Sequence, residues 1–204
     1  MPPEARTITL PDHPAAWAQL GFALGPNGAF SLGGVRLEAT GAGALELGVA
    51  GLRAERPDGL AIVSAPAAPA GPPAPGEHPI GAIAVDHVVA LTDDRARTLA
   101  ALEAAGMTAR RLREPPEAVM PQAFLVLGAL VLELVQAGPG PPALWGLTLV
   151  VEDLGAVAER LNGLLGEARA AVQPGRRIAT LRREAGLSVP LALMTPRPQP
   201  GPPG

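Results

Sequence analysis

A repeated order of elements constrains the fold of this chain more than any other feature of its sequence. A strand, a helix and three further strands are predicted between residues 83 and 136, and the same order is predicted again between residues 147 and 194. Apolar residues alternate in the expected strands and recur at helical spacing in the expected helices. The repetition indicates two copies of one βαβββ folding unit.

The first copy begins with an alternating strand at residues 83–91. Asp93 or Asp94 is suited to cap the helix that follows, and Gly106 supplies the left-handed residue that ends it. After a short strand, a proline-bearing loop leads to two apolar strands. The three strands after the helix are predicted at residues 107–113, 122–127 and 129–136.

The second copy repeats these signals. A strand at residues 147–151 precedes Asp153, which is expected to cap a helix that ends at Gly166. Turn residues separate the strands that follow. These strands are predicted at residues 168–172, 178–184 and 187–194.

A segment rich in proline, alanine and glycine divides the chain. Residues 65–79 cannot form a helix or a strand ladder and are predicted to be an extended linker. The proline-dense tail at residues 197–204 is expected to be disordered. The expected units are a partial N-terminal module at residues 1–64 and complete modules at residues 80–137 and 144–196.

The N-terminal region is predicted to be a shortened third copy. Residues 32–38 share the spacing of two leucines, a glycine and a glutamate with residues 127–133. The segment "LPDHPAAWAQLGF" is typical of a strand end that enters a helix.

Residue types that the chain lacks or rarely uses exclude several classes of function. Cysteine is absent, which excludes disulfides, thiolate catalysis and cysteine-bound metals. Lysine and tyrosine are absent too, so arginine is the only fixed cation available for an anionic ligand. A net charge of −3 and 2% aromatic residues argue against nucleic acid as a partner.

Nothing in the sequence predicts a membrane segment or a targeting signal. The longest apolar run, residues 124–132, is interrupted by Gly128 and is far shorter than the ~20 residues that a span needs. The first residues show no secretion signal, so we expect a cytoplasmic protein. Arginine without lysine, beside abundant alanine, glycine and proline, is typical of a GC-rich coding sequence. We expect a bacterial protein that is a monomer or a homodimer.

Four motifs follow one another along the chain: "DHVVALTDD", "ALEAAGM", "FLVLGALVLELV" and "GLTLVVEDLGAVAERL". In this order they resemble the vicinal oxygen chelate superfamily, which has the glyoxalase and bleomycin-resistance fold. The resemblance covers roughly residues 80–196 and, more weakly, residues 6–64. It implies an α+β fold in which tandem βαβββ modules pair into a curled sheet or open barrel around one cleft.

The resemblance also implies metal ligands on the first and last strands of each module. In the first module these are His87 and Glu133, which suit a divalent ion such as Mn, Zn, Fe, Ni or Mg. In the second module Gly146 stands at the first position, and the last strand offers only Leu191, Ala192 or Leu193. Further ligands would have to enter the cleft from elsewhere, as Glu38, Glu184 or Gln173. The alternatives are a buried His87 held by one hydrogen bond and a solvent-facing Glu133.

Residues for binding a substrate are expected around the same cleft. Alternation sends one of Arg176 and Arg177 into the cleft, and we take Arg177 as the candidate. Arg113 and Gln122 flank a loop that could cover the cleft, and Trp145 is a candidate for its mouth. The alternative for the arginines is a solvated surface position.

Other motifs carry no chemistry. No serine lies in a G-x-S-x-G turn, and the glycine-rich residues 25–34 lack the Lys-Ser/Thr end of a phosphate-binding loop. His13 and His78 have no ligand partners nearby in sequence and are expected at the surface.

The sequence therefore predicts a glyoxalase-like protein that binds a small molecule, and it leaves open whether the protein is an enzyme. An enzyme would be a divalent-metal-dependent lyase, isomerase or dioxygenase acting on an oxygen-rich or anionic substrate, with Glu133 as the catalytic carboxylate that moves a proton. The alternatives are a non-catalytic binding or sequestering protein with a vestigial metal site, and a structural or dimerising module.

Overall fold

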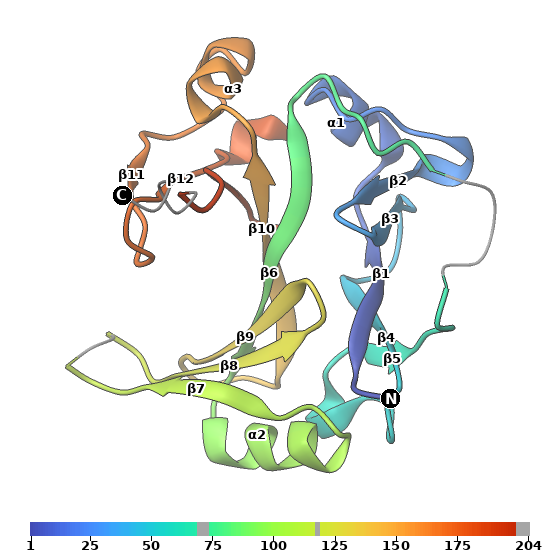
Figure 1. Cartoon of the computed structure of the whole chain (residues 1–204), viewed down its shortest axis with the longest axis vertical. Coiled ribbons are helices and arrows are strands. Elements are labelled where there is room, and N and C mark those ends of the chain that lie inside the picture. The colour runs from blue at the N-terminus through green and yellow to red at the C-terminus, as the bar shows by residue number, and fades with distance from the viewer. Residues whose placement is uncertain (69–73, 117–118, 199–204) are drawn as a thin grey trace, which may run out of the picture.

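The computed structural model describes residues 1–68, 74–116 and 119–198, whose strands form two sheets (Figure 1). The first sheet has five strands in the order β2-β3-β1-β4-β5, and the second has eight in the order β11-β12-β13-β10-β6-β9-β8-β7. Part of the predicted linker (residues 69–73) and most of the predicted tail (residues 199–204) lie outside the described residues.

The first sheet and its short helices comprise β1 (Glu4–Leu10), α1 (Pro14–Gln19), η1 (Pro26–Gly28), β2 (Ala29–Leu32), β3 (Val35–Ala39), β4 (Glu46–Ala50), η2 (Pro57–Gly59) and β5 (Ile62–Ser64). The first part of the second sheet comprises β6 (Ala82–Thr92), α2 (Arg95–Ala104), β7 (Ala109–Arg113), β8 (Gln122–Leu127) and β9 (Leu130–Gln136). The second part comprises β10 (Ala143–Val151), α3 (Leu154–Arg160), β11 (Arg169–Ala170), β12 (Arg177–Thr180), η3 (Arg183–Ala185) and β13 (Leu191–Met194).

The eight-stranded sheet confirms the predicted tandem βαβββ order. In each copy the first strand pairs in parallel with the last strand, β6 with β9 and β10 with β13. The two copies join through β6 and β10, which pair in antiparallel orientation. Asp94 and Asp153 cap α2 and α3 by accepting hydrogen bonds from backbone N–H groups of the first turn. The structure therefore confirms the cap at Asp153 and selects Asp94 over Asp93 for the first helix.

The second copy is less regular than predicted. Helix α3 ends at Arg160, before the expected end at Gly166, and β12 and β13 are shorter than the predicted strands. Gly186 adopts a left-handed conformation with φ +79° after η3, and Pro190 has no N–H group to donate to a strand ladder. The chain between β12 and β13 therefore turns where the alternation suggested strands.

The N-terminal sheet is a reduced counterpart of the whole second sheet, not of a single module. Its order β2-β3-β1-β4-β5 repeats the orientation of every pairing in β8-β9-β6-β10-β13. Strands β1 to β3 and helix α1 correspond to the predicted shortened copy. Strands β4 and β5 add the counterparts of β10 and β13, which sequence comparison of one short motif could not detect.

The two sheets share one hydrophobic core. The N-terminal sheet lies along one face of the second sheet (Figure 1), and the core cluster draws residues from both. On β8 and β9 the residues facing this core, such as Leu125 and Leu132, are 0% exposed. Their neighbours Phe124 and Glu133 point to the opposite face of the sheet, where they line a cavity. Within the described residues, no helix has the length and apolar character needed to cross a membrane.

His78 corrects one expectation, because it is buried and not at the surface. Its ring packs against Phe22 and Phe30, Nδ1 accepts a hydrogen bond from the N–H of Ala23 at 3.1 Å, and Nε2 lies 3.1 Å from the carbonyl oxygen of Ser31. The end of the predicted linker is therefore fixed to the N-terminal sheet.

Candidate functional site

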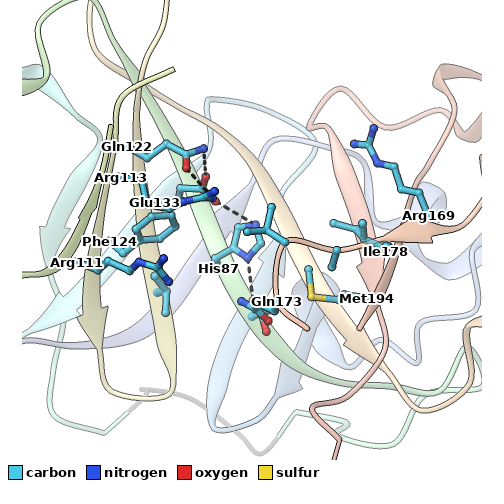
Figure 2. Close-up of a pocket in the computed structure, with 15 residues that line it drawn as sticks. His87, Arg111, Arg113, Gln122, Phe124, Glu133, Arg169, Gln173, Ile178 and Met194 are labelled. Carbon is cyan, nitrogen blue, oxygen red and sulfur yellow. Dashed lines mark hydrogen bonds and ion pairs between the residues drawn. The ribbon is translucent and has the colours of Figure 1, made fainter. Parts of the chain in front are cut away.

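A cavity of about 460 Å³ lies on the face of the eight-stranded sheet that the N-terminal sheet leaves uncovered (Figure 2). Both βαβββ copies contribute to its walls. The first copy provides Asp86, His87, Arg111, Arg113, Gln122, Phe124, Val131 and Glu133. The second copy provides Arg169, Ala170, Ala171, Val172, Gln173, Ile178 and Met194.

The cavity shows that the sheet is curled. Strands β7 and β11 are at opposite ends of the strand order, yet Arg111 of β7 and Arg169 of β11 line the same cavity. The described residues form no pairing between these two strands, so the curl does not close into a barrel. The resemblance implied tandem βαβββ modules that pair into a curled sheet or open barrel around one cleft. The structure has this arrangement, as a curled sheet whose two copies join through their first strands. Residues 82–194 have a glyoxalase-type fold.

A β-bulge in the glyoxalase-type sheet sets the position of His87. His87 pairs with Thr148 of β10, whereas Val85 pairs with the next residue, Leu149, so Asp86 is an extra residue on β6. In a regular strand, neighbouring residues 86 and 87 would point to opposite faces of the sheet. The bulge instead places Asp86 on the same face as His87. Asp86 Oδ2 lies 2.9 Å from His87 Nδ1, and both residues line the cavity.

Arg176 holds the other side of the Asp86 carboxylate. Its side chain is 1% exposed, and its Nη1 atom donates to Asp86 Oδ1 at 2.6 Å and also contacts Gln173 Oε1. Its Nε atom donates to the carbonyl oxygen of Thr195 at 2.8 Å. Arg176, Asp86 and His87 therefore form a continuous chain of charged and polar contacts from the interior to the cavity.

Glu133 approaches His87 from the other side. Its Oε2 atom is 3.5 Å from His87 Nε2, and its Oε1 atom accepts a hydrogen bond from Gln122 Nε2 at 3.0 Å (Figure 2). Gln122 Oε1 in turn accepts from Arg113 Nη1 at 3.3 Å. The imidazole of His87 is thus placed between two carboxylates.

The pKa values of the two carboxylates are shifted in opposite directions. Burial alone would raise the pKa of Asp86, but hydrogen bonds from His87 and Arg176 outweigh it and lower the pKa to about 2. For Glu133 burial dominates and raises the pKa, and the charges of His87 and Arg113 oppose this only in part. Asp86 is a fixed negative charge, whereas Glu133 is the carboxylate that can hold a proton nearer neutral pH.

Four of the six predicted site residues lie in this cavity: His87, Glu133, Arg113 and Gln122. Arg177 and Trp145 do not line it. Of the arginine pair, Arg176 is the one turned inward, while Arg177 is exposed and donates to the carbonyl oxygen of Ala168 at 2.8 Å. Trp145 is half exposed on β10.

Sequence reasoning did not select Asp86, Arg111 and Arg169 as site residues. Asp86 faces the cavity because of the bulge, and the bulge depends on pairing with β10, so the sequence around Asp86 gives no sign of it. Arg111 and Arg169 are exposed residues of edge strands, which alternation alone cannot distinguish from surface charges. Of the residues considered as additional ligands, Gln173 lines the cavity, where it contacts Arg176, whereas Glu38 and Glu184 do not line it.

The second copy lacks the counterparts of His87 and Glu133. Gly146 precedes the cap Asp153 by the same number of residues as His87 precedes Asp94. A Cβ atom on Gly146 would lie 2.8 Å from the carbonyl oxygen of Pro190, so the backbone leaves no room for any ligating side chain. Ala192, which pairs with Thr148 as Glu133 pairs with Val89, carries only a methyl group.

These residues do not fit a resident divalent metal ion. Among the described residues, no three His, Cys, Asp or Glu side chains are placed to hold one ion. His87 and Glu133 alone would leave at least half of the coordination positions to water. Asp86 cannot add a third ligand at Nε2, because it lies on the Nδ1 side of the ring and is bound to Arg176.

No protein-family profile and no curated protein matches the sequence. Among solved structures, methylmalonyl-CoA epimerase from Mycobacterium tuberculosis is 20% identical over 56% of this chain and 89% of its own, with a TM-score of 0.47. Streptomyces coelicolor methylmalonyl-CoA epimerase in complex with 2-nitronate-propionyl-CoA is 20% identical over 56% and 97%, with a TM-score of 0.46. A hypothetical protein from Bacillus halodurans C-125 is 16% identical over 57% and 96%, with a TM-score of 0.47. The order and orientation of the strands identify the fold.

Proposed function

We propose that the chain binds a small organic anion in the cavity of its glyoxalase-type sheet. The observation that carries this proposal is the balance of charge on the cavity walls. Three arginines, Arg111, Arg113 and Arg169, line the cavity. Its two acidic residues are already engaged, Asp86 with Arg176 and His87, and Glu133 with Gln122 and His87. The walls therefore favour a ligand that brings negative charge.

The size and lining of the cavity favour an organic ligand over an inorganic ion. Its volume of about 460 Å³ falls within the ~300–1,000 Å³ typical of small-molecule sites. Phe124, Val131, Ile178 and Met194 give part of the wall an apolar surface. An anionic group attached to an apolar body matches both kinds of wall, because guanidinium groups pair with carboxylates and phosphates.

Thermal shift and calorimetry with benzoate and its neutral isostere benzamide test the proposal. Benzoate should stabilise the native state by RT ln(1 + [L]/Kd) and thereby raise the melting temperature, and benzamide should raise it far less. Arg113→Gln should weaken benzoate binding by roughly tenfold, as expected for one charged contact. Equal binding of the two probes, or none of either, would contradict the proposal.

The metal-dependent alternative predicts different behaviour. A metalloenzyme should gain stability in a series of Mn, Zn, Fe, Ni and Mg, and His87→Ala should remove the gain. Because His87 and Glu133 are only two donors, we expect none of these metals to raise the melting temperature. We also expect the anion to bind equally well in the presence of a chelator. A gain that depends on His87 would favour the metal-dependent alternative.

A second function, proton transfer on the bound ligand, is favoured by the pairing of Glu133 with His87. Burial raises the pKa of Glu133, and a carboxylate of this kind exchanges protons near neutral pH more readily than an ordinary one. Solvent deuterium exchange into C–H bonds next to the ligand carboxylate, followed by NMR, measures this activity. Glu133→Gln should abolish exchange and retain binding. Without exchange by the unsubstituted protein, the chain is a binder without turnover.

A further inference from the structure

Two cations stand on opposite walls of the cavity, at the two ends of the curled sheet. Arg111 lies on β7, Arg169 lies on β11, and Figure 2 shows them on opposite sides of His87. We infer that the ligand carries two anionic groups, one at each end of an apolar body, and that these groups bridge Arg111 and Arg169. The inference rests on the proposed binding of an organic anion and names the class of that anion.

The binding state of the guanidinium groups distinguishes these two arginines from their neighbours. Within the part of the chain that the structure describes, no hydrogen bond or ion pair engages the guanidinium of Arg111 or Arg169. Arg113, Arg176 and Arg177 are each held by a protein oxygen. Arg111 and Arg169 are thus the cavity arginines with full capacity to bind a carboxylate.

The topology of the sheet explains why a ligand with two charged ends suits this cavity. Strands β7 and β11 terminate the strand order, so each has one edge without a β partner. The curl brings residues of both edges to one cavity, which leaves an opening between them that no described strand closes. A ligand bound to both arginines would connect the two edges where strand pairing is missing.

Apolar side chains line the cavity on both sides of His87, between the two arginines. Phe124 lies on the side of Arg111, and Ile178 and Met194 lie on the side of Arg169 (Figure 2). A ligand that bridges the cations must place its middle part against these side chains. The class that meets these conditions is an organic dianion with a short apolar centre, such as an aliphatic or aromatic dicarboxylate.

A purely protective role is the competing explanation. Charged residues on edge strands prevent edge-to-edge association, and arginines at such positions need no ligand. In that case substitution of Arg111 or Arg169 would change solubility and leave ligand affinity unaltered.

Calorimetry with matched ligands and variants separates these explanations. The probes are linear dicarboxylates from succinate to sebacate and the monomethyl ester of each, which keeps the length and removes one charge. The variants are Arg111→Gln and Arg169→Gln. Their controls are Arg110→Gln on β7 and Arg177→Gln on β12, neither of which lines the cavity.

One diacid of intermediate length should bind tightest, and its monoester should bind roughly ten- to a hundredfold more weakly. Each of Arg111→Gln and Arg169→Gln should reduce diacid affinity by a similar factor, while the two controls leave it unchanged. Monoester binding as tight as diacid binding, or diacid affinity that survives either substitution, would overturn the inference and leave anion binding intact. If no diacid and no monoester binds, both the inference and the proposed function are wrong.

Discussion

At the scale of single residues, the chemistry of the cavity depends on how Asp86 and Glu133 differ. Both carboxylates contact the ring of His87, and Asp86 also accepts a hydrogen bond from the buried guanidinium of Arg176. Hydrogen bonds therefore keep Asp86 ionised, whereas burial makes Glu133 the weaker acid. One histidine is thus held by a permanent charge on one side and by a proton-binding group on the other.

Asp86→Asn should destabilise the fold by about 3 kcal/mol at pH 7, because it leaves Arg176 buried without a counter-charge. The pKa of Asp86 falls from 3.8 to about 2 on folding. Its contribution to stability is therefore complete above pH 4 and is lost as the pH falls toward 2. Urea unfolding at pH 7 and pH 3 should show the difference between variant and wild type shrinking in acid.

The control for Asp86→Asn is Asp93→Asn, which breaks a half-exposed ion pair with Arg97 on α2. Exposed pairs contribute less than ~1 kcal/mol. Equal effects of the two substitutions would show that the Arg176–Asp86 contact is not a buried pair in solution.

Glu133→Gln should raise the melting temperature at pH 8 by roughly a few degrees and leave it nearly unchanged at pH 4. The raised pKa of Glu133 means that the native state holds this proton more tightly than the unfolded chain does. Ionisation of Glu133 therefore costs stability as the pH rises through the folded pKa, and glutamine removes that cost. Calorimetric scans at both pH values measure the effect. A gain of equal size at pH 4 and pH 8 would contradict the assigned direction of the pKa.

At the scale of elements, strand β10 decides that the two βαβββ copies are not chemically equivalent. Its Gly146 packs against the backbone of Pro190 so closely that a side chain would collide. The same strand lies opposite the bulge that brings Asp86 beside His87. Strand β10 therefore leaves the second copy without a ligand at residue 146, and its pairing with β6 brings Asp86 beside His87 in the first copy.

Gly146→Ala should destabilise the protein by about 1–3 kcal/mol, because its Cβ atom would meet the Pro190 carbonyl oxygen at 2.8 Å. Gly138→Ala is the matched control, since no atom outside its chain neighbours lies within 4 Å of the added Cβ. The control should change stability by less than ~0.5 kcal/mol. Denaturant unfolding of both variants checks the result, and a Gly146→Ala variant as stable as the control would show that β10 has room for a side chain.

At the scale of the whole molecule, the two sheets behave as one packed unit because distant segments are joined by buried polar contacts as well as by the shared core. Asp12, which follows β1 and is 6% exposed, accepts hydrogen bonds at 2.6 Å from both the N–H and the hydroxyl of Ser188, near the start of β13. Asp58 of η2 accepts a hydrogen bond from Thr98 of α2 at 2.5 Å. The N-terminal sheet thus supports the face of the eight-stranded sheet opposite the cavity.

Asp12→Ala should lower the free energy of unfolding by about 2 kcal/mol, because it removes two hydrogen bonds and leaves the Ser188 N–H without its acceptor. Ser188→Ala removes only the hydroxyl contact and should cost about half as much. Both variants should still unfold in one transition when followed by circular dichroism and by tryptophan fluorescence. Separate transitions for the two probes would show that the sheets fold independently.

The sequence by itself determined the order of the elements, the cap at Asp153, an aspartate cap at residue 93 or 94, the pairing of two βαβββ copies and the presence of His87, Glu133, Arg113 and Gln122 at one site. These features follow from local periodicity, from capping chemistry and from the resemblance of ordered motifs. Only the tertiary structure decided that Asp86 joins His87, that Arg176 turns inward instead of Arg177, and that Arg111 and Arg169 face one cavity. The physical reason is that a bulge, an inward turn and the curl of a sheet are set by packing between strands far apart in the chain, which alternation along one strand does not record.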